Sequence, residues 1–281
     1  MTIMPAGLTG YPAIVLGTMG IPAEGTVAAI HQAIEIGYRA FDTAPIYGNE
    51  AEVGEAIRTS PLDRSELFVT TKLWNSCHGY DQALQAFDRT MQRMQLDMLD
   101  LYLIHWPVPT QGLYVESWRA LVQLRNEGRV RAIGVSNFLP EHLERIIDAT
   151  GVVPALNQVE IHPSFQQAEL RDAHRRLGIC TQAWSPLGNG KDLADPRLAS
   201  IADRLEVSAA QVILAWLAHQ GVLPVAKSSR AEHMRENLDA LNIELLPEDL
   251  EMLAQLDRNE SCFGVDPRTF VAPDGLRDYR P

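Results

Sequence analysis

Short apolar runs alternate with amphipathic stretches along most of the chain. The apolar runs are rich in β-branched and aromatic residues, which predicts strands, whereas the amphipathic stretches repeat their apolar positions every three or four residues, which predicts helices. We expect strands at residues 13–18, 39–44, 67–72, 99–106, 130–137, 155–161, 179–186 and 222–227.

Each predicted strand is followed by at least one predicted helix. Gly37, Gly128 and Gly178 stand just beyond predicted helices, where a left-handed C-terminal cap is common. A pattern resembling a capping box at residues 49–52 opens the second helix. We expect helices at residues 27–36, from 49 onward, at 80–96, 115–126, 141–149, 167–177, 201–205, 209–219 and 231–241, and an additional one at 247–256.

This alternation predicts an α/β protein with a parallel sheet whose outer face is covered by helices. Eight strand–helix units favour closure into a single (β/α)8 TIM barrel over an open sheet. No GxGxxG pattern follows the first strand, which argues against a Rossmann domain. We therefore expect one domain over residues 1–281, with an extra C-terminal helix and an irregular tail at 258–281 that folds over one barrel mouth or stays loose.

The composition narrows the classes of partner. A formal net charge of −12 disfavours binding to nucleic acid or to anionic membranes. No apolar run approaches the roughly 20 residues of a membrane span, and the first residues lack the pattern of a secretory signal. The three cysteines, Cys77, Cys180 and Cys262, are widely spaced and are expected to be idle thiols in a reducing compartment. We expect a cytoplasmic protein.

Polar side chains stand at the ends of three neighbouring predicted strands. Asp42 ends the second strand and Tyr47 follows it, Lys72 ends the third strand, and His105 ends the fourth. Taken singly, the acid could cap a turn, the lysine could be solvated and the histidine could belong to the core. In a parallel barrel, however, the C-terminal strand ends meet at one rim, where active sites lie. The four residues together therefore predict a catalytic site.

A phenol has an ordinary pKa of about 10 and needs help to act as an acid near neutrality. We expect Lys72 to stabilise the phenolate of Tyr47 and to lower its pKa, with Asp42 holding the lysine in place. Tyr47 could then protonate a carbonyl oxygen whose carbon receives a hydride, and His105 could orient that oxygen. The histidines form no HxH or HExxH pattern, so no metal site is expected.

The later strands carry groups suited to holding a hydride donor. Ser136, Asn137 and Gln158 can pair with a carboxamide, although each could equally be a helix cap or a turn contact. Trp184 offers a flat face for a nicotinamide ring, although it could equally be a core aromatic.

The segment after the eighth strand places Lys227 and Arg230 at the start of a helix that Ser229 and Glu232 would open as a capping box. The helix dipole disfavours cations at that end, so an anion such as a phosphate is the expected occupant. The alternative is a solvated surface pair.

These residues lie in motifs that resemble the aldo-keto reductase superfamily over nearly the whole chain. The similarity is strongest to bacterial 2,5-diketo-D-gluconate reductases, whose pattern includes a tryptophan that Trp184 matches. The matching segments are FDTAPIYGNE at 41–50, TTKLW at 70–74, LYLIHWP at 101–107, IGVSNF at 133–138, NQVEIHP at 157–163, WSPLG at 184–188 and KSSR at 227–230.

The resemblance implies metal-free, NADPH-dependent carbonyl reduction by a protein that is usually monomeric and binds a small-molecule substrate. Tyr47 would be the general acid, Asp42 and Lys72 its tuning pair, and His105 the orienting group. The implied cofactor contacts are the carboxamide partners Ser136, Asn137 and Gln158, the stacking Trp184, the pyrophosphate neighbours Ser185, Leu187 and Gly188, the 2′-phosphate ligands Lys227, Ser228 and Arg230, the adenine neighbours Glu236 and Asn237, and Thr18, Ser229 and His233.

One position departs from the family pattern. Many members carry an arginine six residues after the lysine that Lys227 matches, and His233 stands there in this chain. Histidine lacks the guanidinium fork and is mostly neutral at pH 7, so recognition of a 2′-phosphate is weaker. We predict a preference for NADPH with measurable use of NADH.

The substrate pocket is expected to have apolar and aromatic walls from Met19, Ile46, Trp74 and Trp106, with Trp118 as a further candidate and tail residues 263–270 completing it. The tail is short beside the long loops of steroid-handling relatives, which predicts small or polar carbonyl substrates such as dicarbonyls and keto-sugars. Two other functions stay open. One is an NADPH-binding regulatory protein with little turnover, and the other is an aldolase or isomerase in which Lys72 forms a Schiff base.

Overall fold

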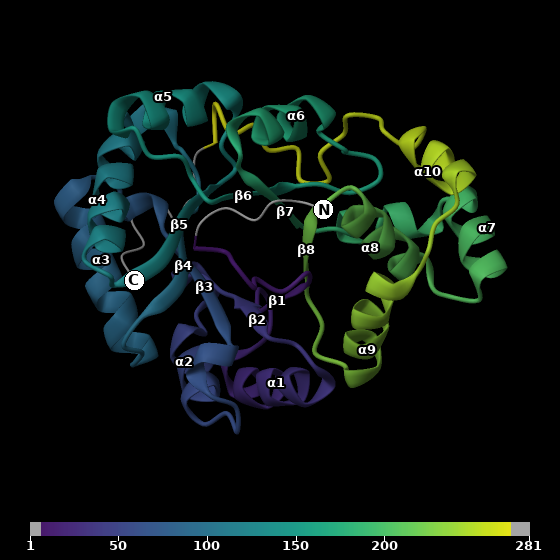
Figure 1. Ribbon diagram of the computed structural model, residues 1–281, viewed down its shortest axis with the longest axis horizontal. Coiled ribbons are helices and arrows are strands. Elements are labelled where there is room, and N and C mark those ends of the chain that lie inside the picture. The colour runs from purple at the N-terminus through teal and green to yellow at the C-terminus, as the bar shows by residue number, and fades with distance from the viewer. Residues whose placement is uncertain (1–6, 271–281) are drawn as a thin grey trace.

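The computed structural model describes residues 7–270, which form a closed barrel of parallel strands with helices around it (Figure 1). The strands follow one another around the barrel in sequence order, and the last pairs with the first. The predicted (β/α)8 barrel is therefore confirmed. The strands are β1 Val15–Gly17, β2 Ala40–Asp42, β3 Phe68–Leu73, β4 Leu99–Ile104, β5 Val130–Ser136, β6 Leu156–Glu160, β7 Cys180–Trp184 and β8 Leu223–Ala226.

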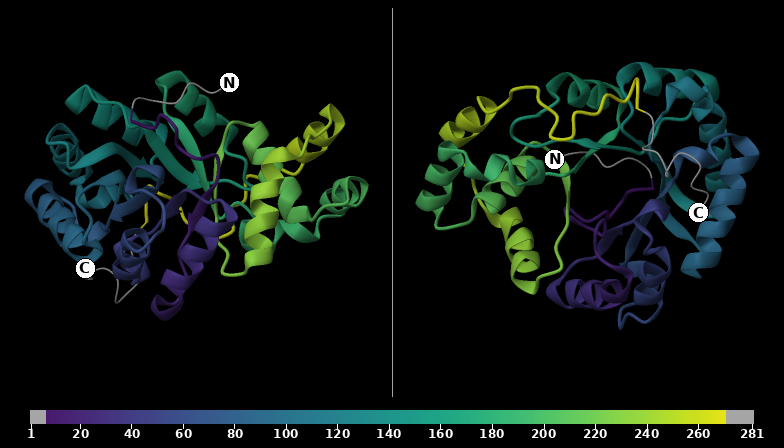
Figure 2. Two further views of the ribbon diagram at one scale, coloured as in Figure 1. Left: turned by 60° about the horizontal axis from the view of Figure 1, so that its bottom comes forward. Right: turned by 180° about the vertical axis from the view of Figure 1, so that it is seen from behind.

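The helices form a layer outside the barrel, as the view from behind also shows (Figure 2). Within residues 7–270 none of them is both long enough and apolar enough to cross a bilayer. The helices are α1 Ala23–Ile36, α2 Glu50–Arg58, α3 Tyr80–Met94, α4 Tyr114–Asn126, α5 Pro140–Thr150, α6 Ala168–Leu177, α7 Pro196–Leu205, α8 Ala209–His219, α9 Ala231–Asp239 and the additional α10 Pro247–Ala254.

Most observed strands are shorter than the predicted ones. The fourth predicted strand included His105, for example, whereas β4 ends at Ile104. The predicted strand runs past the last ladder hydrogen bonds because His105 is also buried and Trp106 is half-buried. A hydrophobic pattern in the sequence indicates which residues are buried. Here the buried segment extends beyond the residues that pair in the sheet.

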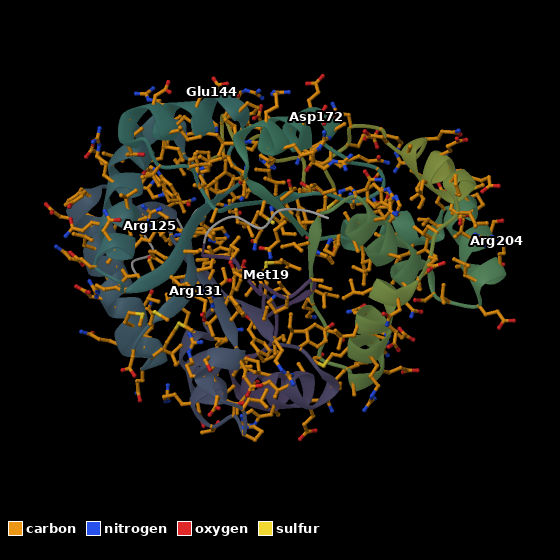
Figure 3. The ribbon with its side chains drawn as sticks, in the orientation of Figure 1. Met19, Arg125, Arg131, Glu144, Asp172 and Arg204 are labelled. Carbon is orange, nitrogen blue, oxygen red and sulfur yellow. The ribbon has the colours of Figure 1, made fainter. Side chains whose placement is uncertain are left out.

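The barrel interior is closed at the end where the strands begin. Leu8 and Tyr11, from the segment before β1, pack with side chains near the strand starts, such as Ala40 and Phe68. Within residues 7–270 this packed layer fills the interior at the strand starts, so the space for a ligand lies where the strands end. Charged side chains on the outer helices, such as Glu144 and Arg204, point away from the barrel, whereas Met19 lies over its centre in the same view (Figure 3).

The capping box predicted at residues 49–52 is wrong. Asn49 precedes α2, but its side chain makes no capping bond to that helix. Its amide instead donates to the carbonyl oxygens of Thr18 (3.0 Å) and Ile21 (3.1 Å), and its oxygen accepts from the Thr43 hydroxyl (2.8 Å). Asn49 thus fastens the loops after β1 and β2 to each other, beside the predicted site.

Candidate active site

A cavity of about 880 Å³ opens at the C-terminal ends of the strands. Its walls include side chains from the ends of β2, β5, β6, β7 and β8 and from the loops that follow them. Asp42, Tyr47 and His105 all line it, and Lys72 lies directly beneath. The structure therefore brings the four predicted catalytic residues together.

Lys72 is fully buried at the base of the cavity and is held by two oxygens. Its Nζ donates to Asp42 Oδ1 (2.5 Å) and to the Thr43 carbonyl oxygen (2.9 Å). Burial alone would lower the pKa of the lysine, but Asp42 and then Tyr47 favour the ammonium, and the net effect raises its pKa. Lys72 is therefore a fixed positive charge, and an uncharged Schiff-base amine is disfavoured.

Tyr47 stands above this charge, with Lys72 Nζ 5.2 Å from the centre of its ring. The expected lowering of the Tyr47 pKa is wrong in net direction. Burial of the phenol raises the pKa and outweighs the lowering by Lys72, and Asp42 also raises it. Tyr47 is thus a protonated donor whose conjugate base the lysine can stabilise when the proton leaves.

His105 is held edge-on between two aromatic rings. Its ring lies 6.0 Å from that of Tyr47 and 5.2 Å from that of Trp74. Burial, followed by the charges of Lys72 and His78, lowers the pKa of His105 well below its ordinary value. The ring is therefore neutral, and its Nδ1 is buried with no partner within residues 7–270.

Gln182 and Tyr11, which were not predicted from the sequence, complete the floor of the cavity beside the predicted Gln158. Gln158 Nε2 donates to Asp42 Oδ2 (2.8 Å) and to Gln182 Oε1 (2.7 Å), and Gln182 Nε2 donates to the Tyr11 hydroxyl (3.2 Å). Both hydrogens of the Gln158 amide are thus used, which leaves its oxygen to accept from a ligand. Gln158 and Gln182 occupy paired positions on β6 and β7, a cross-strand register that only the folded barrel shows.

Ser136, Asn137 and Trp184 form a second hydrogen-bonded group on the wall. Asn137 Nδ2 donates to the His105 carbonyl oxygen (2.9 Å) and to Ser136 Oγ (3.0 Å), while Trp184 Nε1 donates to Asn137 Oδ1 (2.8 Å). Asn137 has φ 62°, and Ser185, directly after the tryptophan, has φ 48°. This left-handed backbone turns the chain sharply at the ends of β5 and β7 and lays the side chains along the wall.

The loop after β7 continues this wall. Ser185 and Leu187 line the cavity as expected, together with Asn189, Gly190 and Ser208, which were not predicted. Gly188 is buried and does not line the cavity. Thr18 is likewise fully buried, and its hydroxyl donates to the Asp42 carbonyl oxygen (3.1 Å) and to Asn49.

The far end of the cavity is formed by Lys227, His233, Glu236 and Asn237. Lys227 is exposed and has no acidic partner in the described part of the chain. Arg230 has none there either, and its guanidinium contacts the His233 ring.

The capping box predicted from Ser229 and Glu232 is wrong. The helix α9 begins at Ala231, so Arg230 is its N-cap residue and makes no side-chain capping bond. The serine that acts locally is Ser228, which is buried and accepts a hydrogen bond from the Arg230 backbone N–H (3.1 Å). Ser229 and Arg230 stand outside the cavity wall.

The four side chains expected to form the walls of a substrate pocket are apolar or aromatic. Met19, Ile46, Trp74 and Trp106 all line the cavity. Trp118 does not, so that candidate is wrong: it is fully buried between helices, and its Nε1 donates to the Thr150 hydroxyl (3.1 Å).

The C-terminal segment completes the cavity on the same side. Phe263 and Val265 line it, and Phe263 packs against Trp184 at 5.5 Å between ring centres. The Phe270 ring stacks on Trp106 at 4.1 Å. The expectation that residues near 263–270 reach the pocket is borne out at these positions, while the rest of the predicted tail, 271–281, lies outside the described residues.

The cavity fits a nicotinamide dinucleotide phosphate by the chemistry of its walls. One end offers the free Gln158 oxygen and the flat Trp184 ring, which suit a carboxamide-bearing aromatic ring. The other end offers Lys227, which has no paired acid among residues 7–270 and therefore suits a phosphate.

Comparison with known proteins gives consistent matches. A sequence profile of the Aldo/keto reductase family matches residues 13–258. An aldo-keto reductase of Mycolicibacterium smegmatis is 48% identical over 259 residues, covering 92% of this chain and 94% of the relative. A solved structure of a Gox0644 variant in complex with NADPH has a TM-score of 0.87 and 45% identity, covering 91% of this chain and 93% of that one. A protein provisionally named 2,5-diketo-D-gluconic acid reductase B has a TM-score of 0.88 and 35% identity, covering 98% and 96%.

Proposed function

Because the chain belongs to the aldo/keto reductase family, and so is an NAD(P)H-dependent oxidoreductase, we propose that it reduces small aldehydes and ketones to alcohols, with a preference for NADPH. The observation that carries the proposal is the fixed Lys72 ammonium, paired with Asp42, beneath a protonated Tyr47. A pure binding protein has no need of this arrangement.

The proton transfer follows from the charges at the site. When bound, the cofactor would supply the hydride that the carbonyl carbon of the substrate accepts. Tyr47 then gives its phenolic proton to the carbonyl oxygen, and the resulting phenolate is stabilised by Lys72, which keeps its own proton because its pKa is raised. Solvent afterwards restores the proton on Tyr47.

His105 contributes orientation in this mechanism. Its neutral ring can donate an N–H to the carbonyl oxygen and fix its direction. Trp74 and Trp106 line the same region and exclude water from the reacting group.

The cofactor would be held along the cavity by the same groups that line it. Gln158 Oε1 would accept from the carboxamide, Trp184 would stack on the ring, and Lys227 would meet the 2′-phosphate. His233 in place of an arginine weakens the phosphate contact, so measurable activity with NADH is part of the proposal.

The substrate proposal is narrower than the reaction. Small dicarbonyls and keto-sugars such as 2,5-diketo-D-gluconate suit a pocket in which aromatic walls meet polar catalytic groups, and the comparison with a provisionally named 2,5-diketo-D-gluconic acid reductase B supports this class. Strong activity on bulky polycyclic ketones with none on glyoxals or keto-sugars would contradict it.

We also propose a monomer in the cytoplasm. The monomer is what the family resemblance implies, and the cytoplasm is supported by Cys77, Cys180 and Cys262, which are free thiols, as a reducing compartment favours. Sedimentation of the purified protein tests the monomer, and a dimer in solution would contradict it.

The test compares turnover with cofactor binding. Nicotinamide absorbance would be followed with NADPH and then NADH against methylglyoxal, phenylglyoxal, an aromatic aldehyde and 2,5-diketo-D-gluconate. We expect Tyr47→Phe to reduce kcat by about a hundredfold to ten-thousandfold, because it removes the donated proton, while leaving the Kd for NADPH within about twofold. Tyr80→Phe on α3 removes a hydroxyl that contacts Gln123 far from the cavity and should leave both constants unchanged.

The same experiments distinguish the proposed reductase from the two alternative functions. Tight NADPH binding without turnover in the unaltered protein would favour a cofactor-binding regulatory protein. Substrate trapped on Lys72 by borohydride would instead point to Schiff-base chemistry.

A further inference from the structure

A cluster of metal-ligating residue types lies outside the proposed catalytic machinery. Glu160 is the last residue of β6, His162 follows it in the next loop, and Cys262 belongs to the segment after α10. The closest ligand atoms of these three residues all lie within 4.8 Å of one another. Glu160 and His162 are buried, whereas Cys262 is partly exposed, so the cluster has an inner wall and an open side.

The histidine is oriented as a metal-binding histidine is. His162 Nδ1 lies 2.8 Å from Asp192 Oδ2, and its Nε2 faces Glu160 Oε1 at 3.0 Å. A carboxylate on one ring nitrogen fixes the ring and leaves the other nitrogen for a cation. The backbone makes room for this pair, because a Cβ at Gly188 would lie 2.6 Å from Asp192 Oδ2 and 3.1 Å from His162 Nδ1.

The thiol is fixed over the same carboxylate by its own backbone. The Cys262 N–H donates to Glu160 Oε1 (2.7 Å), and the neighbouring Ser261 hydroxyl donates to Glu160 Oε2 (2.7 Å). Lys191 Nζ donates to the Cys262 carbonyl oxygen (3.0 Å), so the residue is tied from both sides. Several contacts of the C-terminal segment therefore hold Cys262 beside Glu160.

We propose that Glu160 Oε1, His162 Nε2 and Cys262 Sγ form a binding site for Zn²⁺, with Asp192 as the carboxylate that orients the histidine. Carboxylate, imidazole and thiolate are the three ligand types that zinc uses in proteins, and solvent on the open side can take the fourth position.

The exchange balances in charge. His162 Nδ1 and Nε2 each face a carboxylate oxygen, at 2.8 and 3.0 Å, so both ring nitrogens carry protons in the metal-free cluster, and the Cys262 thiol carries its own. A divalent cation would displace the thiol proton of Cys262 and the Nε2 proton of His162, while the Nδ1–H of His162 stays hydrogen-bonded to Asp192. Two positive charges leave and two arrive, and the net charge of the buried cluster is unchanged.

The site would fasten the segment that completes the cavity. Phe263, next to Cys262, lines the cavity and packs against Trp184. Asp192 comes from the loop after β7, whose Asn189 and Gly190 also line it. A bound cation would thus join β6, this loop and the C-terminal segment at one point. The competing interpretation of the same contacts is a metal-free ion pair of a charged His162 between two carboxylates.

The test uses the full-length protein without an affinity tag, freed of metal with a chelator and titrated with Co²⁺ as a spectroscopic substitute for Zn²⁺. We expect saturation at one equivalent with a thiolate-to-cobalt charge-transfer band, displacement of that band by Zn²⁺, and a rise in Tm of about 5 °C at roughly a hundredfold excess over Kd.

The variants decide which residues hold the cation. Cys262→Ser and His162→Gln should each abolish the charge-transfer band and the rise in Tm. Cys180→Ala and His219→Gln, a buried thiol and an exposed histidine away from the cluster, should retain both. Cys262 is partly exposed in a loop, so its serine variant is expected to fold. The proposal is overturned if the unaltered protein shows no thiolate band at saturating Co²⁺, or if Cys262→Ser leaves the band intact.

Discussion

At the scale of single residues, burial and charge act in opposite directions on the proton of Tyr47. Burial raises its pKa more than Lys72 lowers it, and His105 is kept neutral by burial and by the same lysine. The lysine therefore matters for the state after proton transfer rather than for an ionised phenol beforehand.

These pKa shifts of Tyr47 and His105 predict that catalytic activity changes little with pH. With saturating NADPH, kcat/KM for carbonyl reduction should show no ionisation between about pH 6 and pH 9, because Tyr47 stays protonated and His105 stays neutral throughout. A loss of activity centred near pH 7 that disappears in His105→Gln would show that the histidine titrates in turnover.

Lys227 gives a second residue-scale prediction. Lys227→Met should raise the KM for NADPH by about tenfold, since it removes a cavity-lining cation that has no acidic partner in residues 7–270. The KM for NADH, which lacks the 2′-phosphate, should change by less than about twofold. Arg235→Met removes an exposed charge of α9 outside the cavity and serves as the matched control. Equal losses with both cofactors would place the phosphate contact elsewhere.

At the scale of elements, α2 and α3 approach closely at one glycine. A Cβ at Gly54 would lie 2.0 Å from the Met94 carbonyl oxygen and 2.6 Å from the Met94 Cα, which are backbone atoms. The Arg58 side chain donates to the same carbonyl oxygen and fixes its position. The close crossing of the two helices depends on the missing side chain.

Gly54→Ala should therefore lower the free energy of unfolding by about 3 kcal/mol, the scale of a packing clash that backbone must absorb. Gly25→Ala in α1 meets nothing within 4 Å and should instead raise it by about 0.5–1 kcal/mol, because alanine favours the helix. Urea unfolding of both variants measures the difference. Similar effects at the two positions would mean that the helices shift apart without cost.

At the scale of the whole molecule, two buried histidines make the fold sensitive to acid. Burial lowers the pKa of His78 and of His174 to about 4. The folded protein binds their protons less readily than the unfolded chain, so their contribution to stability is present above about pH 6.5 and is lost as the pH falls toward 4. His162 acts in the opposite sense. Burial lowers its pKa, but the hydrogen bonds and charges of Asp192 and Glu160 outweigh burial and raise it, so its contribution to stability is present at low pH and is lost as the pH rises through the raised pKa.

When the pH is lowered from 7 to 5, we expect the free energy of unfolding to fall by roughly 2 kcal/mol for each of the two histidines. His174→Gln should reduce the difference between the two pH values by about that amount, although it disturbs the hydrogen bonds of the ring to Asn157 and Thr181. The exposed His219→Gln should leave the difference unchanged. An equally steep pH dependence in the His174 variant would exclude this histidine as a source.

The sequence by itself determined the order of strands and helices, the closed barrel and the rim at which Asp42, Tyr47, Lys72 and His105 meet. Hydrophobic periodicity and the polar residues at strand ends are local features of the sequence. Because all strands of a parallel barrel end at the same rim, these local features are enough to predict where the polar residues lie.

Only the tertiary structure decided which side chains face one another across the barrel and how deeply each is buried. The bond from Gln158 to Asp42 joins residues 116 positions apart, and Gln182 meets Gln158 through strand register. Trp118, a candidate for the pocket from the sequence, is fully buried between helices. The direction of the Tyr47 pKa shift was decided in the same way, because desolvation depends on all the atoms that surround the phenol and no single segment contains them.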